Sequence, residues 1–180
     1  MAACAGLALA GVAGPVSAQD TPAMAGMEHR APVDCSLVRM ALPPELAGWS
    51  SRAPAPAAKD KGGLKKAALT VGKAVDAGLM RTSDVRYILR PEKPGGSVSY
   101  GGMFGFTISE AGTYRVALGS GAWIDLVKDG KAVESSNHGH GPDCTGVRKM
   151  VDFPLVPGRY VLQLAANGGE GLPVMIAKLP

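Results

Sequence analysis

Residues 112–131 read GTYRVALGSGAWIDLVKDGK, and this stretch indicates the fold class of the chain. Tyr114, Val116 and Leu118 alternate with other residues, as expected for a strand with one buried face. A Gly-Ser-Gly turn signal separates this strand from a second run of strand formers at 123–127. Asp129-Gly130 suits the tight turn whose twist matches two paired strands. The stretch therefore predicts two strands and a hairpin that opens a third.

The same alternation of strands and turns continues on both sides of this stretch. Further strands are predicted over residues 84–90, 102–108, 131–135, 148–153, 158–164 and 173–178. Residues 67–79 are compatible with a short helix, but Gly72 and Gly78 disfavour a long one. Eight or nine strands in about 115 residues are typical of an antiparallel β-sandwich. We therefore expect an all-β sandwich domain over 64–180, jelly-roll or immunoglobulin-like.

Residues 1–18 have the composition of a signal peptide. They read MAACAGLALAGVAGPVSA, and Val16-Ser17-Ala18 ends in the small-x-small pattern that signal peptidase cuts. A membrane anchor is the alternative, but the apolar run is shorter than the roughly 20 residues of a spanning helix. No basic residue precedes it, since the first is Arg30. We expect a periplasmic or secreted protein with no transmembrane segment in the mature chain.

Residues 19–63 are expected to form a flexible N-terminal arm and linker. Residues 51–58, SRAPAPAA, have the composition of an extended linker. One piece is expected to dock. Residues 42–49 predict a short helical turn with proline near its start and glycine at its end, anchored by Leu46 and Trp49.

Export determines the expected state of the cysteines. Cys4 lies in the predicted signal peptide, which leaves Cys35 and Cys144 in the mature chain. In an oxidising compartment, an even pair predicts a disulfide. Closing so long a loop stabilises the fold by up to about 4–5 kcal/mol in the chain-entropy model.

The positive charge gives a weaker indication of a partner. The net charge is +4, and Lys59, Lys61, Lys65 and Lys66 lie close together. They indicate either a patch for an anionic lipid or polysaccharide, or a solvated linker. No aromatic residue interleaves with them, as a stacking nucleic-acid surface needs, so no nucleic-acid partner is expected.

Residues 137–144, NHGHGPDC, hold the strongest candidate ligands of a metal. In an extended backbone His138 and His140 point the same way, with Asp143 or Glu134 as an oxygen ligand. If Cys144 is in a disulfide, the remaining donors suit zinc, copper(II), nickel or iron(II). The alternative is an inter-strand loop with solvated histidines.

A second candidate metal motif lies in the N-terminal arm. Met24, Met27 and His29 resemble the short methionine motifs of exported copper-handling proteins, and thioethers select copper(I). The alternative is coincidence in an Ala-, Gly- and Met-rich tail. A Cys35–Cys144 bond would tether this tail near His138, so that the two motifs form one site.

The remaining candidates favour structure over catalysis. Asp125 is expected to form a structural ion pair with Arg115 or Arg148 rather than to act as an acid catalyst. The same two alternatives apply to Asp152. Tyr114 and Trp123 are expected in the core. No nucleophile elbow, phosphate loop or dinucleotide fingerprint is present in the sequence. We therefore lean against an enzyme.

Four motifs carry a resemblance: AGTYRV at 111–116, WID at 123–125, HGHG at 138–141 and RKMVDF at 148–153. Together they resemble a family of small exported proteins of alphaproteobacteria that has no well-defined activity. Some members bear the automatic name homogentisate 1,2-dioxygenase, which implies an iron site of two histidines and one carboxylate in a much larger chain. The Gly-Thr-Tyr and Pro-Gly-Arg-Tyr turns are loosely similar to pre-peptidase C-terminal sandwich domains, which are accessory modules.

These observations together favour an exported periplasmic binding or accessory protein. Its candidate cofactor is copper or zinc, held by the His-Gly-His segment, and its candidate partners are a metal ion or small ligand, a cell-envelope protein or a polysaccharide. A carbohydrate- or protein-binding module without metal is the first alternative. A small iron-dependent dioxygenase is the second.

Overall fold

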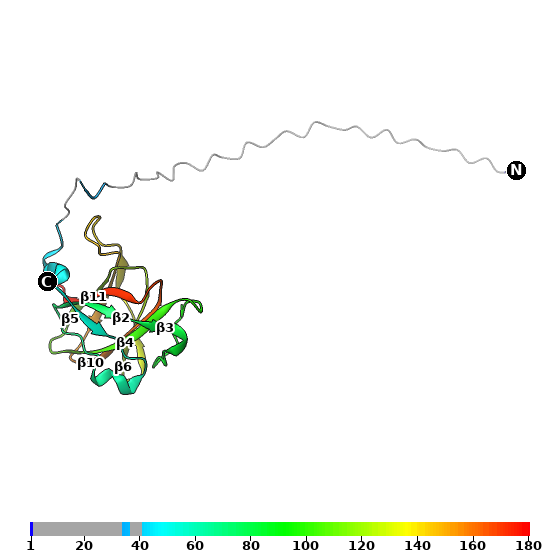
Figure 1. Ribbon diagram of the computed structural model, residues 1–180, viewed down its shortest axis with the longest axis horizontal. Coiled ribbons are helices and arrows are strands. Elements are labelled where there is room, and N and C mark those ends of the chain that lie inside the picture. The colour runs from blue at the N-terminus through cyan, green and yellow to red at the C-terminus, as the bar shows by residue number, and fades with distance from the viewer. Residues whose placement is uncertain (2–33, 37–40) are drawn as a thin grey trace. The chain divides into compact units, whose positions relative to one another are not determined.

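The computed structural model describes Met1, residues 34–36 and residues 41–180. Within the unit Val33–Pro180, the described residues form two β-sheets packed face to face (Figure 1). The predicted all-β sandwich, dominated by antiparallel pairs, is confirmed. Apart from Met1, the predicted signal peptide lies outside the described residues, as does the Met24, Met27 and His29 motif.

Two sheets of six and five strands make up the sandwich. In order across the first sheet lie β1 (Arg52–Pro56), β2 (Ala74–Gly78), β11 (Gly171–Lys178), β5 (Gly112–Leu118), β9 (Lys149–Leu155) and β8 (Asn137–Gly139). In order across the second lie β3 (Met80–Arg81), β4 (Tyr100–Ile108), β10 (Gly158–Asn167), β6 (Trp123–Lys128) and β7 (Lys131–Val133). The pair β1–β2 is parallel and the other pairs are antiparallel. Short 3-10 helices cover Pro44–Ser50 (η1), Lys61–Lys65 (η2) and Thr82–Asp84 (η3).

The core lies between the two sheets and follows the predicted alternation. Phe104, Phe106 and Ile108 of β4 are buried, as are the alternating apolar residues of β5. Burying one such side chain stabilises a fold by about 1.5–3 kcal/mol. The predicted hairpin is also present, since β6 pairs with β7 and both Asp129 and Gly130 have positive φ.

The sandwich begins before residue 64, where the linker was expected to end. Residues 52–56 form the edge strand β1, which tolerates Pro54 and Pro56 because one side of it needs no ladder donors. The docking turn is confirmed as η1. Leu46 and Trp49 are buried and pack against Ala117 and Met175 on the outer face of the first sheet.

The strand predicted over residues 84–90 is wrong. Asp84 ends η3 and residues 85–90 have no regular structure, and the buried side chain of Gln163 provides hydrogen bonds that a neighbouring strand would otherwise provide. Its Oε1 accepts from the backbone N–H of Ile88 (2.8 Å), and its Nε2 donates to the carbonyl of Leu89 (2.9 Å). A side-chain amide thereby satisfies backbone groups that a sheet ladder satisfies elsewhere.

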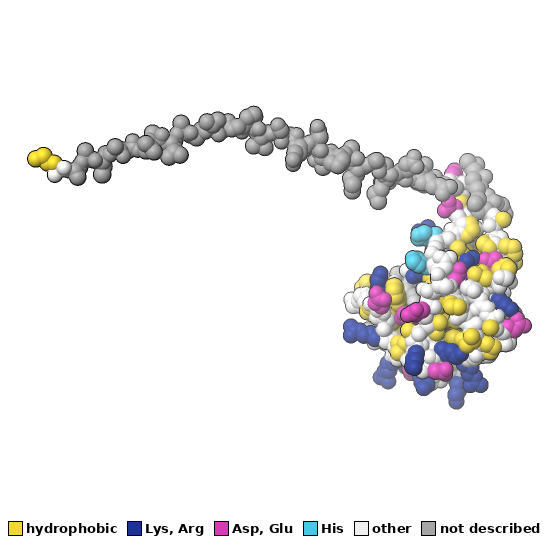
Figure 2. Space-filling model, turned by 180° about the vertical axis from the view of Figure 1, so that it is seen from behind, with side chains coloured by type: hydrophobic (Ala, Val, Ile, Leu, Met, Phe, Trp, Pro, Cys, Tyr) yellow, Lys and Arg dark blue, Asp and Glu magenta, His cyan; other side chains and the backbone are white. Residues whose placement is uncertain are grey.

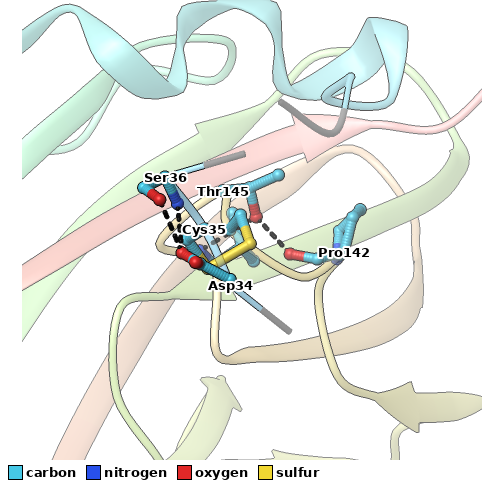
Figure 3. Close-up of a disulfide and its surroundings, with 7 residues drawn as sticks. Asp34, Cys35, Ser36, Pro142 and Thr145 are labelled. Carbon is cyan, nitrogen blue, oxygen red and sulfur yellow. Dashed lines mark hydrogen bonds between the residues drawn. A yellow bond between two sulfur atoms is a disulfide. The ribbon is translucent and has the colours of Figure 1, made fainter. Parts of the chain in front are cut away.

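The predicted Cys35–Cys144 disulfide is present, with Cα atoms 5.2 Å apart (Figure 3). Its C-terminal side is held by Thr145, whose Oγ1 donates to the Pro142 carbonyl and whose own carbonyl accepts from the Trp49 indole N–H. Disulfides persist in oxidising compartments, so the bond is consistent with an extracytoplasmic location. No helix among the described residues is long and apolar enough to cross a membrane.

Candidate functional site

The first two residues of the His-Gly-His segment belong to the edge strand β8, and His140 lies just past its end. β8 pairs with β9 and places His138 opposite Val151. Both His138 and His140 are exposed, and histidine side chains are visible at one surface of the molecule (Figure 2). They nevertheless line different hollows. His138 borders the pocket beside β6 and β7, and His140 borders a smaller one next to Asp143 and the disulfide.

The histidine segment offers fewer metal ligands than its sequence indicates. Cys144 is bonded to Cys35, so its sulfur is not a free thiolate. Among residues 34–36 and 41–180, no group of three His, Cys, Asp or Glu side chains is placed to hold a metal ion. His140 alone has a ligand-like setting. Its Nδ1 lies 3.1 Å from the Arg148 carbonyl oxygen, which can only accept, so Nδ1 carries a proton and Nε2 is the ring nitrogen that could bind a metal.

A pocket of about 590 Å³ lies between β6, β7, β8 and β9, and its most unusual group is Asp125. Asp125 Oδ1 accepts from the Trp123 indole at 2.9 Å, while the buried Oδ2 has no hydrogen-bond partner among the described residues. Burial raises the pKa of this carboxyl, and the Trp123 hydrogen bond opposes the shift. Lys149 borders the same pocket, and burial lowers the pKa of its ammonium group.

Trp123 is half-buried on this pocket's wall and is not part of the core, contrary to expectation. The ammonium groups of Lys93 and Lys149 lie 5.1 and 5.5 Å from its ring centroid. Such contacts are cation–π interactions. The ring is therefore already in contact with two side chains of the protein, which leaves it poorly suited as a platform for a sugar.

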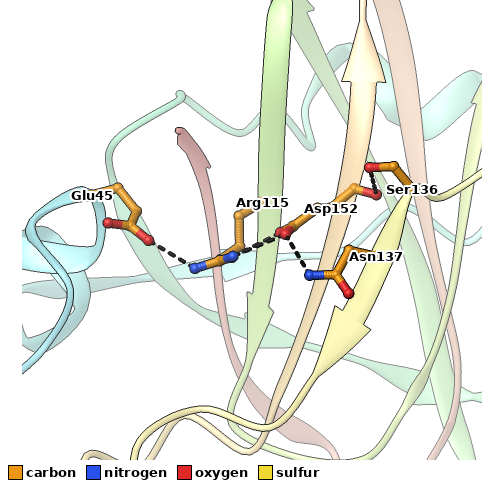
Figure 4. A network of polar contacts seen from close by, with 5 residues as sticks. All are labelled: Glu45, Arg115, Ser136, Asn137 and Asp152. Carbon is orange, nitrogen blue, oxygen red and sulfur yellow. Dashed lines mark hydrogen bonds and ion pairs between the residues drawn. The ribbon is translucent and has the colours of Figure 1, made fainter. Parts of the chain in front are cut away.

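The predicted ion pair of Asp125 with Arg115 or Arg148 is wrong, because Arg115 pairs with Asp152. The two join β5 to β9 on the outer face of the first sheet through two hydrogen bonds, of 2.8 and 2.9 Å (Figure 4). Arg115 also donates to Glu45 of η1 at 2.8 Å. The hydrogen bonds to Asp152 are the main reason that the pKa of Arg115 is raised. This network attaches η1 to the sheet and is structural.

A hollow of about 850 Å³ lies at the end of the sandwich where β4 ends and β5 and β10 begin. We call it the end groove. Its walls come from η2, residues 68–71, β4 with the turn after it, β5, β10 and β11. Its apolar lining consists of Leu64, Leu69, Phe106, Ile108, Tyr114, Tyr160 and neighbouring aliphatic residues.

Cations surround this apolar lining. Lys61, Lys65 and Arg159 border the end groove and are exposed. Lys178 also borders it, but its ammonium is bonded to Glu110, which lowers the pKa of that carboxyl. Lysine and arginine side chains gather at the end of the molecule where η2 lies (Figures 1 and 2). The groove is therefore apolar inside and positive outside.

Only one feature of the sequence indicates this groove. The lysine cluster of residues 59–66 predicts either a patch for an anionic lipid or polysaccharide, or a solvated linker, and two of its members border the groove. No protein-family model matches the chain, and no curated protein sequence matches it. The geometry of the described residues is therefore the basis for a functional proposal.

Proposed function

We propose that the protein is an exported binding or accessory protein without catalytic activity, and that its ligand site is the end groove. One observation carries this proposal: a hollow of about 850 Å³ with apolar side chains inside and, at its border, three cations that take part in no ion pair of the described residues. This volume falls within the roughly 300–1,000 Å³ of small-molecule sites, which combine apolar walls with a few polar groups. The disulfide supports export to a periplasmic or extracellular location.

The choice of a small ligand follows from the shape and chemistry of the lining. The groove is a hollow formed by six segments at one end of the sandwich, not a flat sheet face. Hollows of this kind suit small molecules, whereas protein partners bury larger and flatter surfaces. The apolar side chains of its lining offer contact area to a ligand, and the cations at its border offer charge. No described contact favours a polysaccharide, a protein partner or an iron-dependent dioxygenase over this function.

A neutral solvatochromic dye tests whether the end groove binds apolar molecules. We expect Nile red to gain fluorescence with the full-length protein. Ser109→Trp should weaken its binding at least about tenfold, because an indole at this exposed bordering position obstructs the groove. Ser135→Trp is the matched control, since Ser135 is also exposed but borders the Asp125 pocket. Equal binding by both variants would contradict the proposal.

Copper or zinc binding at His138 and His140 is a second candidate function. The observation in its favour is the Nδ1–H···O=C contact of His140 with Arg148, since metal-bound histidines commonly donate their other N–H to a carbonyl. Asp143 borders the same hollow as His140 and is a candidate oxygen ligand. Met24, Met27 and His29, which lie outside the described residues, would supply any copper(I) ligands.

Metal analysis of untagged protein tests this second candidate. We expect dialysis against Cu²⁺ or Zn²⁺ to leave bound metal on the wild type, and His138→Ala/His140→Ala to lose most of it. Because the wild-type side chains are exposed, the variant should keep its thermal midpoint within a few degrees. Metal content that is equal in the two proteins would rule out a site at these histidines.

A further inference from the structure

We infer that the ligand of the end groove is a single-chain amphiphile with an anionic head group, such as a carboxylate or a phosphate monoester. This inference rests on the proposed function, because it names the ligand of the same groove. It follows from three properties of the lining: its aromatic interior, the internal pairing of its polar groups, and the position of its cations.

The interior of the groove is built on apolar side chains of the core, and Leu64, Val71 and Val161 are its half-buried members. Phe106 of β4 lies opposite Tyr160 of β10, and their rings stack with centroids 5.5 Å apart. Ile108 continues this surface along β4, and Leu64 of η2 closes it from the other side. Such a surface gains free energy by covering methylene groups, at about 0.8 kcal/mol for each buried CH₂.

The two tyrosine hydroxyls of the interior are already satisfied within the protein. The Tyr160 hydroxyl donates to the Val156 carbonyl at 2.8 Å and accepts from the Val156 N–H. The Tyr114 hydroxyl donates to the Glu110 carbonyl at 2.9 Å. A sugar ring needs hydrogen-bond partners for each hydroxyl that it buries, whereas an alkyl chain needs none. The interior therefore favours an alkyl chain over a carbohydrate.

The border of the groove supplies the charge that selects the head group. Lys61 and Lys65 lie on η2, and Arg159 faces the groove from β10. None of these three takes part in an ion pair of the described residues, whereas Lys178 is neutralised by Glu110. Three uncompensated cations beside an apolar interior match an anion that is joined to a hydrocarbon chain.

A series of ten-carbon amphiphiles separates chain binding from head-group selection. Decanoate, decyl phosphate, decanol and decyltrimethylammonium have the same chain but differ in head group. Each is titrated, below its critical micelle concentration, against Nile red bound to the full-length protein. We expect both anions to displace the dye at least about tenfold more tightly than decanol and the cation, which corresponds to about 1.4 kcal/mol. The order of decanoate and decyl phosphate identifies the preferred source of the anionic head.

Charge reversal identifies the cations responsible. Lys61→Glu/Lys65→Glu/Arg159→Glu should weaken both anions about tenfold and leave decanol unchanged. The matched control is Arg86→Glu/Arg90→Glu/Lys131→Glu, which changes the net charge equally at exposed positions that do not border the groove. The control should keep the anion preference, apart from a long-range effect that is removed at 0.15 M salt.

The outcomes distinguish this inference from the proposed function. If decanol displaces the dye as well as the anions do, the anion inference fails and the binding function stands. If the dye does not bind and no amphiphile protects the protein against thermal unfolding, both fail. If dye binding falls as the protein concentration rises and a dimer forms, a second copy of the chain occupies the groove, which overturns the inference.

Discussion

Replacing Cys35 and Cys144 by serine should lower the free energy of unfolding by up to about 4–5 kcal/mol. The bond joins residues that are 109 positions apart. Without it, the unfolded chain is no longer closed into a loop, so its conformational entropy rises and the unfolded state is favoured. At about 2–4 °C for each kcal/mol in a domain of this size, the thermal midpoint should fall by about 10–20 °C. The measurement is thermal unfolding followed by circular dichroism.

Reduction of the wild type provides the matched control. A thiol reductant should lower the wild-type midpoint to that of Cys35→Ser/Cys144→Ser, and it should leave the double variant unchanged. The groove is formed by other residues, so dye binding by the folded double variant should persist at low temperature. Equal midpoints for oxidised and reduced wild type would show that the bond adds nothing to the stability of the sandwich.

The features that the sequence predicted correctly depend on local rules. Alternation at Phe104, Phe106 and Ile108 identifies the buried face of a strand because successive side chains point to opposite sides. Asp129-Gly130 identifies a hairpin because the turn needs two residues with positive φ. The disulfide followed from counting cysteines after the predicted signal peptide. Each of these inferences requires no knowledge of which strands are neighbours.

The features that the sequence missed depend on strand order. Residues 52–56 have the composition of a linker, and they become β1 only because β2 offers a free edge. Residues 84–90 have strand propensity, but Gln163 satisfies their backbone from 75 positions away. The end groove brings together six segments between residues 61 and 178. No local sequence pattern predicts that these six segments lie side by side.

The histidine segment is an exception to the rule that residues two apart in a strand share a face. His138 and His140 are two residues apart, which places them on one side of a regular strand. β8 ends at Gly139, however, so His140 lies beyond the last paired residue and contacts the Arg148 carbonyl. The two rings consequently border different hollows. Two side chains that are two residues apart are expected on the same face only where the strand pairing includes both residues.

Arg115→Met should be the most destabilising single substitution on the outer face of the first sheet, at about 3–5 kcal/mol. The side chains of Arg115, Asp152 and Glu45 are only 16%, 7% and 10% exposed. Removing the guanidinium leaves two nearly buried carboxylates without their cation, and an uncompensated buried charge costs several kcal/mol. Urea unfolding at constant pH measures the loss.

Two further variants separate lost charge balance from lost packing. Arg52→Met removes the cation of an Arg–Asp pair whose side chains are 31% and 52% exposed, together with a hydrogen bond to the Trp49 carbonyl, so it should cost at most about 2 kcal/mol. Arg115→Met/Asp152→Leu/Glu45→Met removes all three charges. It should regain most of the stability that Arg115→Met loses, because apolar replacement of a buried ionic group is often neutral.

The difference between these variants also determines what the ionic network contributes to the fold. Arg115 lies between η1 and β9, and η1 carries Leu46 and Trp49 onto the outer face of the first sheet. If the network mainly positions η1, Arg115→Met should expose Trp49 and shift its fluorescence to longer wavelength before global unfolding, and the triple variant should restore the spectrum. If Arg115→Met costs no more than Arg52→Met, the buried pair is not what holds η1 to the sheet, and the packing of Leu46 and Trp49 does so together with the hydrogen bonds that Trp49 makes with Arg52 and Thr145.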